Sequence, residues 1–174
     1  MTVHVIIVNG PPSAGKTSVT DELRNSLPGT VAISGDALRA FAPADARTQL
    51  GGGATYRAAG ALARAYLELG AARVIFDYPC LRAAHVRYFG EALPTGIELK
   101  IFTLWPTLEL LEEREQRKRL MHPARARAPA VADCYREMAK NLGAMGEVLE
   151  AGALSPAQLA SLIHQRCLDP APHL

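Results

Sequence analysis

The sequence has few cysteines and little net charge. Its three cysteines, Cys80, Cys134 and Cys167, lie far apart and form neither a CxxC pair nor a cluster with histidine at metal-ligand spacing, so we expect free thiols. The formal net charge is only +2 at pH 7, which gives no general attraction to nucleic acid or to an anionic membrane. A nucleic-acid partner is therefore not expected, although a local basic cluster is compatible with phosphate binding.

Long hydrophobic runs are also missing. No segment approaches the ~18 consecutive apolar residues of a membrane-spanning helix, and the N-terminus lacks the basic and apolar regions of a signal peptide. We therefore expect a cytoplasmic protein without a membrane partner. With 174 residues, 49% of them hydrophobic and 21% charged, the chain has the size and composition of one globular domain spanning residues 1–174.

Apolar segments of two kinds alternate along the chain. Residues 3–8 (VHVIIV) form a continuous apolar run, typical of a strand buried on both faces of a parallel sheet. Val19, Leu23 and Leu27 instead recur at the four-residue spacing of a helix face. Further strands are expected at residues 31–34, 74–77, 99–105 and, with the weakest pattern, 148–149. This alternation predicts an α/β fold, a three-layer α/β/α sandwich around a mainly parallel five-stranded sheet.

The segments between these elements carry local signals of their own. Pro43 and the triplet 51–53 (GGG) interrupt the periodicity, so we expect residues 40–54 to be an irregular flap or substrate loop. Residues 155–158 (SPAQ) combine an N-cap serine, a proline at the first helical position and a glutamine three residues after the cap, which predicts a helix start. Trp105 closes a predicted strand, where we expect a packing role.

The strongest functional signal is the sequence GPPSAGKT at residues 10–17. It fits the phosphate-binding pattern G-x-x-x-x-G-K-[ST] and lies between a predicted buried strand and a predicted amphipathic helix, as a P-loop does. The alternative is a glycine-rich turn without a ligand, but the flanking strand and helix favour the P-loop. The N–H groups of the loop and the positive end of the following helix would then hold the phosphates of a nucleoside triphosphate.

Residues of this loop have separate expected roles. We expect Lys16 to bridge the β- and γ-phosphates of ATP, and the Thr17 hydroxyl to bind Mg²⁺. Side chains at the two glycines of the motif would obstruct the approach of the backbone to the phosphates. The residues expected to contact the nucleotide are Gly10, Pro11, Pro12, Ser13, Ala14, Gly15, Lys16, Thr17 and Ser18.

Asp36 follows the second predicted strand and so lies at the carboxyl edge of the sheet, where ligands bind in α/β folds. We expect it to act as the catalytic base that orients an acceptor hydroxyl and takes its proton. Arg39, three residues on, would share a helical face with it and hold the acceptor. We assign Tyr56 and Arg57 to the acceptor as well. The alternative is that Asp36 caps a short helix, since Asp-Ala-Leu-Arg is an ordinary N-cap sequence.

Asp77 ends the third predicted strand, after three apolar residues. This is the arrangement of a Walker B aspartate, which holds Mg²⁺ directly or through water. The alternative is an ordinary loop carboxylate, because Tyr78 and Pro79 follow it. Asp77 and Thr17 are therefore the two predicted metal-binding residues.

Arginines are concentrated in an expected lid at about residues 114–130. Two of them follow glutamates by four residues, and helix-stabilising ion pairs account for those two. Arg114 has no such partner and continues the inward side of the predicted helix, so we expect it to contact the nucleotide and to stabilise the transferred phosphoryl group. Arg125 and Arg127 lie in a proline-flanked stretch that is suited to close over the substrate, and they are further candidates.

These residues resemble a known family. Residues 8–10 (VNG) followed by 13–16 (SAGK) are similar to the start of chloramphenicol phosphotransferases, P-loop kinases that phosphorylate an antibiotic hydroxyl. Asp36 falls where that family has its catalytic aspartate, and residues 70–77 (GAARVIFD) resemble its third strand. The resemblance covers about residues 1–130 and is tight only in the P-loop.

Two features depart from that family. The segment between Asp36 and the glycine-led third strand is short, and Tyr78 stands where the family tends to have a second acidic residue. Asp36 and Arg39 also resemble the Asp-x-x-Arg motif of polynucleotide 5′-hydroxyl kinases and of zeta-toxin-like sugar-nucleotide kinases. These relatives share the mechanism implied by the resemblance and differ in the acceptor.

The sequence therefore predicts a P-loop kinase with an Arg-rich lid, which transfers the γ-phosphoryl group of ATP, with Mg²⁺, to a hydroxyl of a small molecule. An antibiotic is one candidate for the acceptor. The first alternative is a polynucleotide 5′-hydroxyl kinase or a nucleotide-sugar kinase. The second, outside the enzymes, is a nucleotide-gated binding module that has no acceptor.

Overall fold

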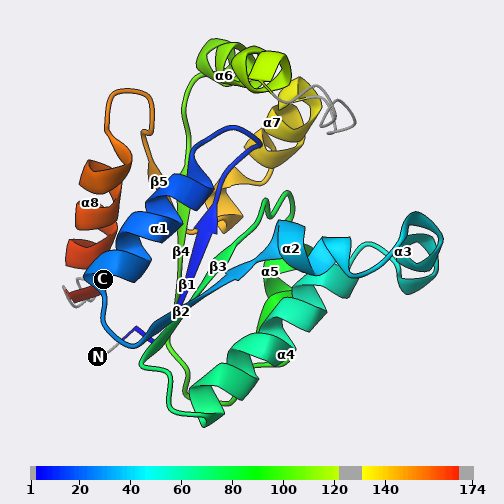
Figure 1. Ribbon diagram of the computed structural model, residues 1–174, viewed down its shortest axis with the longest axis vertical. Coiled ribbons are helices and arrows are strands. Elements are labelled where there is room, and N and C mark those ends of the chain that lie inside the picture. The colour runs from blue at the N-terminus through cyan, green and yellow to red at the C-terminus, as the bar shows by residue number, and fades with distance from the viewer. Residues whose placement is uncertain (1–2, 122–130, 169–174) are drawn as a thin grey trace.

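The computed structural model describes residues 3–121 and 131–168, which contain a sheet of five parallel strands (Figure 1). In chain order these are β1 (Val5–Asn9), β2 (Thr30–Ser34), β3 (Arg73–Asp77), β4 (Leu99–Leu104) and β5 (Glu147–Leu149). Their order across the sheet is β2-β3-β1-β4-β5, and each adjacent pair is parallel. The predicted parallel sheet is confirmed, including its weakly patterned fifth strand.

The apolar run near the start of the chain becomes the central strand. All five residues of β1 are buried, because β3 and β4 flank the strand and helices cover both faces of the sheet. Ile6 and Val8 belong to one apolar core, and Val5 and Ile7 belong to the other. Two cores explain why the strand is continuously apolar instead of alternating with polar residues.

Helices cover the sheet on both faces and complete three layers (Figure 1). One face carries α1 (Lys16–Ser26) and α8 (Pro156–Leu168), whose Leu23 and Ile163 are fully buried in the same core. The other face carries α4 (Ala54–Glu68) and α5 (Ala83–Gly90), whose Ala63 and Phe89 are fully buried in the second core. This arrangement confirms the predicted α/β/α sandwich.

The remaining helices lie toward the carboxyl ends of the strands. In Figure 1, α6 (Leu108–Met121) and α7 (Val131–Ala139) stand above that edge of the sheet, and α2 (Gly35–Ala40) follows β2 directly. A further helix, α3 (Ala44–Leu50), projects away from the sheet. Because the loops after β1, β2 and β3 open at the same edge, residues far apart in the sequence meet there.

Helix α3 corrects the expectation that residues 40–54 are irregular. Pro43 occupies the N-cap position of α3 in an extended conformation, and Gly51 follows the helix at φ 78°. The proline and the glycines therefore bound a short helix instead of preventing one. None of the α3 residues is buried, so the helix has no apolar stripe from which it could be predicted.

Three smaller predictions have direct structural outcomes. The capping box is confirmed, because the Ser155 N–H donates to the Gln158 side chain (2.9 Å) and the Gln158 N–H donates to Ser155 Oγ (3.2 Å). The three cysteines are buried free thiols. Within residues 3–121 and 131–168, no helix combines the length and the apolar character needed to cross a membrane.

Candidate active site

The P-loop connects β1 to α1. Gly10 has φ 142°, and a Cβ at this position would lie 2.6 Å from the carbonyl oxygen of Leu104, so no side chain fits there. Gly15 is the N-cap of α1 at φ 100°, in the left-handed region, and no side chain of the described residues caps the N-terminus of α1. The N–H groups of the first helical turn are therefore free to bind an anion.

Lys16, the first residue of α1, is buried against this loop. Its Nζ donates a hydrogen bond to the Pro11 carbonyl oxygen (3.0 Å). Burial lowers the pKa of the Lys16 ammonium group, and the carboxylates of Asp77 and Asp36 oppose that shift. An ammonium group in such partly desolvated surroundings interacts more strongly with a phosphate than one in bulk water.

Asp77 and Thr17 form the part of the site suited to a metal ion. Thr17 Oγ1 donates a hydrogen bond to Asp77 Oδ2 (2.8 Å). Asp77 is the last residue of β3, not a loop residue, and its burial raises the pKa of the carboxyl while Lys16 and the Thr17 hydrogen bond lower it. Hydroxyl and carboxylate oxygens are the hard ligands that Mg²⁺ prefers, usually one or two from the protein beside phosphates and water. This donor pair fits Mg²⁺.

Asp36 lies in the first turn of α2, directly after β2. Ser34 caps this helix, because the Ala37 N–H donates to Ser34 Oγ (3.3 Å). The alternative that Asp36 is the N-cap is therefore wrong. Ser34 pairs with Asp77 in the register of β2 and β3, which brings the start of α2 beside the predicted metal site.

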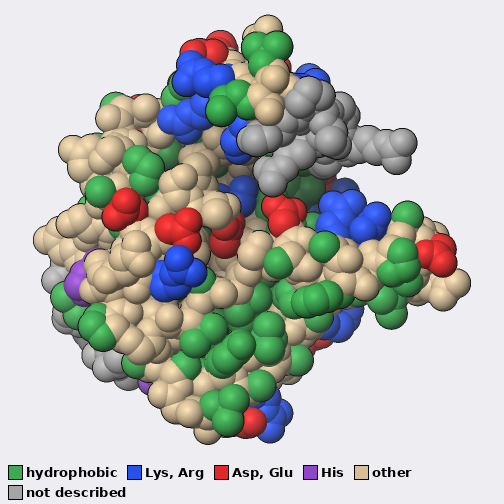
Figure 2. All heavy atoms as spheres, viewed as in Figure 1, with side chains coloured by type: hydrophobic (Ala, Val, Ile, Leu, Met, Phe, Trp, Pro, Cys, Tyr) green, Lys and Arg blue, Asp and Glu red, His purple; other side chains and the backbone are tan. Residues whose placement is uncertain are grey.

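One crevice joins the P-loop to Asp36. It is a cavity of about 610 Å³ at the carboxyl edge of the sheet. Figure 2 shows a hollow there, with basic side chains on the α6 side and both acidic and basic side chains on the opposite side. The predicted site residues that line the crevice are Lys16, Thr17, Asp36, Arg39, Tyr56 and Asp77, with Pro12, Ser13, Gly15 and Ser18 of the P-loop segment. The structure thus brings together the residues predicted for phosphate, metal and acceptor.

A second cavity, of about 600 Å³, extends this crevice between α2, α3 and α4. We call it the acceptor cavity, after the role that we propose for it below. Arg39, Arg47, Tyr56 and Tyr78 line both spaces, so the two are continuous. A Cβ at Gly35 would clash with the Tyr78 ring, so this glycine allows Tyr78 to pack directly against α2. The other walls of the acceptor cavity are mainly apolar.

Tyr56 and Arg57 are neighbours in α4 with different surroundings. Tyr56 is buried and stacks on His85, with ring centroids 4.2 Å apart. Arg57 instead pairs with Glu91 (3.3 Å) and covers the ring of Tyr88 (4.0 Å). It lines neither the crevice nor the acceptor cavity, because successive helix residues point about 100° apart. The structure does not bring Arg57 to the acceptor residues with which it was predicted to act.

Arg114 reaches the P-loop but does not line the crevice of Asp36. Its Nη1 donates a long hydrogen bond to the Ala14 carbonyl oxygen (3.4 Å). Arg114 lines a third cavity, of about 300 Å³, whose apolar walls include Val19, Leu154 and Leu159. We call this space the nucleotide cavity, because it adjoins the P-loop and its apolar walls suit a nucleobase. Ser13, Gly15, Ser18 and Lys118 line both this cavity and the crevice.

The expected lid is described only in part. Its first residues, 114–121, form the end of the regular helix α6, whereas Arg125 and Arg127 lie outside the described residues. Within α6 the two ion pairs expected from four-residue spacing are present, at 2.7 and 3.4 Å. The structure therefore places Arg114 at the P-loop.

Comparison with known families gives a match over most of the chain. A family model described as "AAA domain" matches residues 5–144. The chain belongs to this AAA-domain family. No curated protein matches the sequence closely enough to count as a relative.

Solved structures resemble this AAA domain over nearly its whole length. The tunicamycin resistance protein of Deinococcus radiodurans has a TM-score of 0.68 and 20% identity, with 98% of this chain and 99% of that one covered. A sugar kinase from Janibacter sp. HTCC2649 has a TM-score of 0.64 and 17% identity, covering 98% and 96%. Shikimate kinase from Acinetobacter baumannii, in complex with shikimate, has a TM-score of 0.63 and 19% identity, covering 99% and 97%. The shared fold is that of P-loop kinases.

One contact at the P-loop of this AAA domain was missed by sequence reasoning. Ser13 Oγ donates a hydrogen bond to Glu115 Oε2 (2.7 Å), and the Glu115 side chain is only 13% exposed. Glu115 lines the crevice, so a carboxylate stands beside the loop expected to bind phosphates. The four-residue spacing explains only the pair with Arg119. The contact with Ser13 joins residues 102 positions apart, for which the sequence has no local signal.

A buried polar network fixes the strand ends beneath the site. Asn9, the last residue of β1, donates from Nδ2 to Thr103 Oγ1 (3.0 Å) and accepts from the Cys80 N–H (2.7 Å). Thr103 Oγ1 in turn donates to the Met145 carbonyl oxygen (2.6 Å). Because Asn9 and Thr103 are fully buried, these bonds tie the segment after Asp77 to β1 and β4.

Proposed function

We propose that this protein is an ATP-dependent kinase that transfers the γ-phosphoryl group, with Mg²⁺, to a hydroxyl of a small molecule. The observation that carries the proposal is the shared crevice, in which Lys16 and Thr17 of the P-loop face the same space as the exposed carboxylate of Asp36. A site that only binds nucleotide does not need this carboxylate. A phosphotransferase uses one to orient the acceptor hydroxyl and to accept its proton.

The donor side of the proposed site is built by the P-loop and α6. The N–H groups of the loop and of the first turn of α1 would hold the phosphates, and Lys16 would exchange its bond to the Pro11 carbonyl oxygen for phosphate oxygens. Arg114 and the apolar walls of the nucleotide cavity would hold the rest of the nucleotide. Mg²⁺ bound by Thr17 and Asp77 would supply charge neutralisation at the phosphate oxygens.

The proposed transfer is a single displacement at the γ-phosphorus of ATP. The acceptor oxygen forms a bond to the γ-phosphorus, and the bond between that phosphorus and the bridging oxygen of ADP breaks. The proton of the acceptor hydroxyl passes to the Asp36 carboxylate. Lys16 stabilises the charge on the transferred group, because its ammonium lies at the P-loop in partly desolvated surroundings.

The acceptor is proposed to occupy the acceptor cavity. Its walls combine Arg39 and Arg47 with mainly apolar side chains, and no carboxylate of the described residues lines it. These walls favour an uncharged or anionic molecule with an apolar body over a polycation. The fold is shared with a tunicamycin resistance protein, and the P-loop resembles that of chloramphenicol phosphotransferases, so an antibiotic hydroxyl is our leading candidate.

Asp36→Asn tests the proposal. ATP turnover is measured alone and then with a panel of hydroxyl compounds that includes antibiotics, and wild-type turnover should rise with an acceptor. We expect the variant to lose at least about 100-fold of that acceptor-dependent turnover, because the general base is gone. Its affinity for ATP should not fall, because Asp36 does not contact the nucleotide in our proposal and the loss of a negative charge from the crevice does not weaken phosphate binding.

Asp45→Asn is the matched control. Asp45 lies in the first turn of α3 and lines none of the three cavities, so both measurements should match wild type. Two outcomes would contradict the proposal. One is equal loss of ATP binding and turnover in the Asp36 variant, and the other is wild-type turnover that no hydroxyl compound stimulates, as for a nucleotide-gated binding module.

A further inference from the structure

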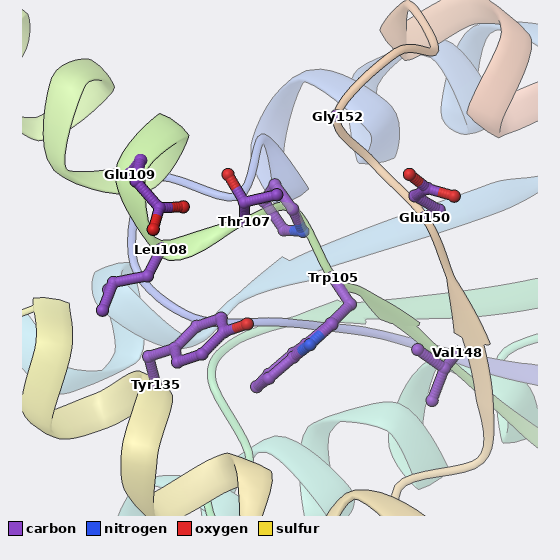
Figure 3. Close-up of a pocket in the computed structure, with 9 residues that line it drawn as sticks. Trp105, Thr107, Leu108, Glu109, Tyr135, Val148, Glu150 and Gly152 are labelled. Atoms are coloured by element: carbon purple, nitrogen blue, oxygen red, sulfur yellow. The ribbon is translucent and has the colours of Figure 1, made fainter.

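A fourth cavity, of about 620 Å³, lies outside the three spaces of the proposed kinase site (Figure 3). None of its lining residues lines the crevice, the acceptor cavity or the nucleotide cavity. We call it the Trp105 pocket, and its lining residues include Trp105, Leu108, Glu109, Tyr135, Val148 and Glu150. They come from the loop after β4, the start of α6, α7, and the segment that begins in β5. The volume is within the range of small-molecule sites.

An aromatic pair forms one wall of the Trp105 pocket. The rings of Trp105 and Tyr135 stack with centroids 4.3 Å apart and an angle of 21° between their planes. Both side chains are only partly buried, and Figure 3 shows them side by side at the pocket. Trp105 thus has the packing role expected from the sequence, but it also presents aromatic surface to an open cavity. Leu108 and Val148 add apolar surface.

Two carboxylates give the Trp105 pocket its charge. Glu109 comes from α6 and Glu150 from the segment after β5, and both are exposed. Neither forms an ion pair with another described residue, and no lysine, arginine or histidine of the described residues lines the pocket. The pocket is therefore locally negative in a chain whose formal net charge is +2.

We propose that the Trp105 pocket binds an organic ammonium ion with apolar substituents. Because Trp105 and Tyr135 stack on each other, a cation can bind only to the ring faces turned away from the stack. The two glutamates neutralise its charge, and Leu108 and Val148 pack against its alkyl groups. A metal ion fits this lining less well, because Mg²⁺ held by one or two protein oxygens takes further ligands from phosphates and water, and this pocket has no P-loop residue and mainly aromatic and apolar walls. Within the described residues, no group of three or more His, Cys, Asp and Glu side chains is arranged to hold one. The proposal stands independently of the kinase activity.

The fluorescence of Trp105 tests this proposal directly, because Trp105 is the one tryptophan of the chain. The probe is acetylcholine. Its matched comparison is 3,3-dimethylbutyl acetate, in which an uncharged carbon replaces the ammonium nitrogen. Both compounds are titrated at constant ionic strength and without ATP. Neither probe has a hydroxyl, so neither can act as a kinase acceptor. We expect acetylcholine to change the emission in a saturable way and the isostere to bind at least about tenfold more weakly. Isothermal titration calorimetry gives a second readout of the same binding.

The double variant Glu109→Gln with Glu150→Gln locates the binding site. It removes both charges with little change of shape, and we expect acetylcholine to bind at least about tenfold more weakly. Glu112→Gln is the control, since Glu112 is exposed on the same helix and lies outside the pocket. Circular dichroism checks that each variant is folded. The proposal is overturned if neither readout detects acetylcholine, if the isostere binds equally well, or if the double variant binds as wild type does.

Discussion

Tyr56 and His85 hold the segment that follows β3. The Tyr56 hydroxyl donates to the Pro79 carbonyl oxygen (2.7 Å), and the Leu81 N–H donates to His85 Nδ1 (3.1 Å). An imidazole that accepts at Nδ1 must be unprotonated there. Because Tyr78, Pro79 and Leu81 all line the crevice, the neutral form of one histidine supports the wall of the proposed active site.

The pKa of His85 connects this support to pH. Burial lowers the pKa of the imidazole, and the nearby Arg82 guanidinium lowers it further. The folded protein therefore takes up this proton less readily than the unfolded chain does. Neutral His85 makes its full contribution to the free energy of unfolding above about pH 6.5, the pKa of histidine in the unfolded chain. This contribution is lost as the pH falls from that value through the lower pKa of His85 in the folded protein.

His85→Gln tests this dependence. Glutamine can still accept from the Leu81 N–H but does not titrate, so the loss of stability between about pH 7.5 and pH 5 should be smaller than in wild type. The measurement is the free energy of unfolding by chemical denaturation at both pH values. If wild type and the variant lose the same free energy of unfolding between the two pH values, His85 does not contribute the predicted dependence.

At the scale of elements, α6 is joined to the P-loop by two contacts. Arg114 contacts the Ala14 carbonyl oxygen, and Glu115 accepts the hydrogen bond of Ser13. Ser13 has φ 66°, a left-handed conformation that is uncommon outside glycine. The arginine brings favourable charge to a phosphate site, whereas the glutamate brings unfavourable charge into the crevice. The position of α6 therefore affects how strongly the P-loop attracts a triphosphate, because this helix carries both the arginine and the glutamate.

Glu115→Gln separates these effects. The amide oxygen of glutamine can still accept from Ser13 Oγ, but the negative charge beside the loop is gone, so ATP should bind about three- to tenfold more tightly. The measurement is the dissociation constant for ATP by calorimetry. Glu112→Gln, at an exposed position of α6 that lines neither the crevice nor the nucleotide cavity, is the matched control and should bind as wild type does. Unchanged or weaker binding in the Glu115 variant would contradict the electrostatic argument.

The elements that were predicted from sequence are those with a local signal. The P-loop, the strand carrying Asp77 and the capping box at Ser155 depend on residues within a few positions of one another, and the structure contains all three. Helix α3 has no buried face, so periodicity could not predict it. The contact of Ser13 with Glu115 depends on how distant elements pack, which no local pattern specifies.

The position of Arg57 shows that local sequence also does not specify which residues of a helix reach the site. Proximity to Tyr56 in sequence suggested a shared role, but the buried face of α4 contains Tyr56, Ala59 and Ala63 and leaves Arg57 pointing toward Glu91. Which face of a helix is buried depends on its partner layers as well as on its own sequence. The strand ends and loops that contribute to the site could therefore be predicted from the sequence. The full set of side chains that line the cavity could not.

At the scale of the whole molecule, strand order assembles the proposed site. The order β2-β3-β1-β4-β5 places the ends of β2, β3 and β1 side by side. The residues that follow or end these strands are Asp36, Asp77 and the P-loop, and all three meet in one crevice. Segments separated by tens of residues thus converge through the parallel arrangement of the sheet. The central claim is that this crevice carries a phosphoryl group from ATP to an acceptor hydroxyl.

The most direct test of this claim follows the phosphoryl group itself. ATP labelled with ¹⁸O on its γ-phosphoryl group is incubated with the protein, Mg²⁺ and the panel of hydroxyl compounds, and the products are analysed by mass spectrometry. We expect the labelled group to appear on one class of acceptor and ADP to form in equal amount. Label found in inorganic phosphate alone, with every hydroxyl compound unchanged, would contradict the claim.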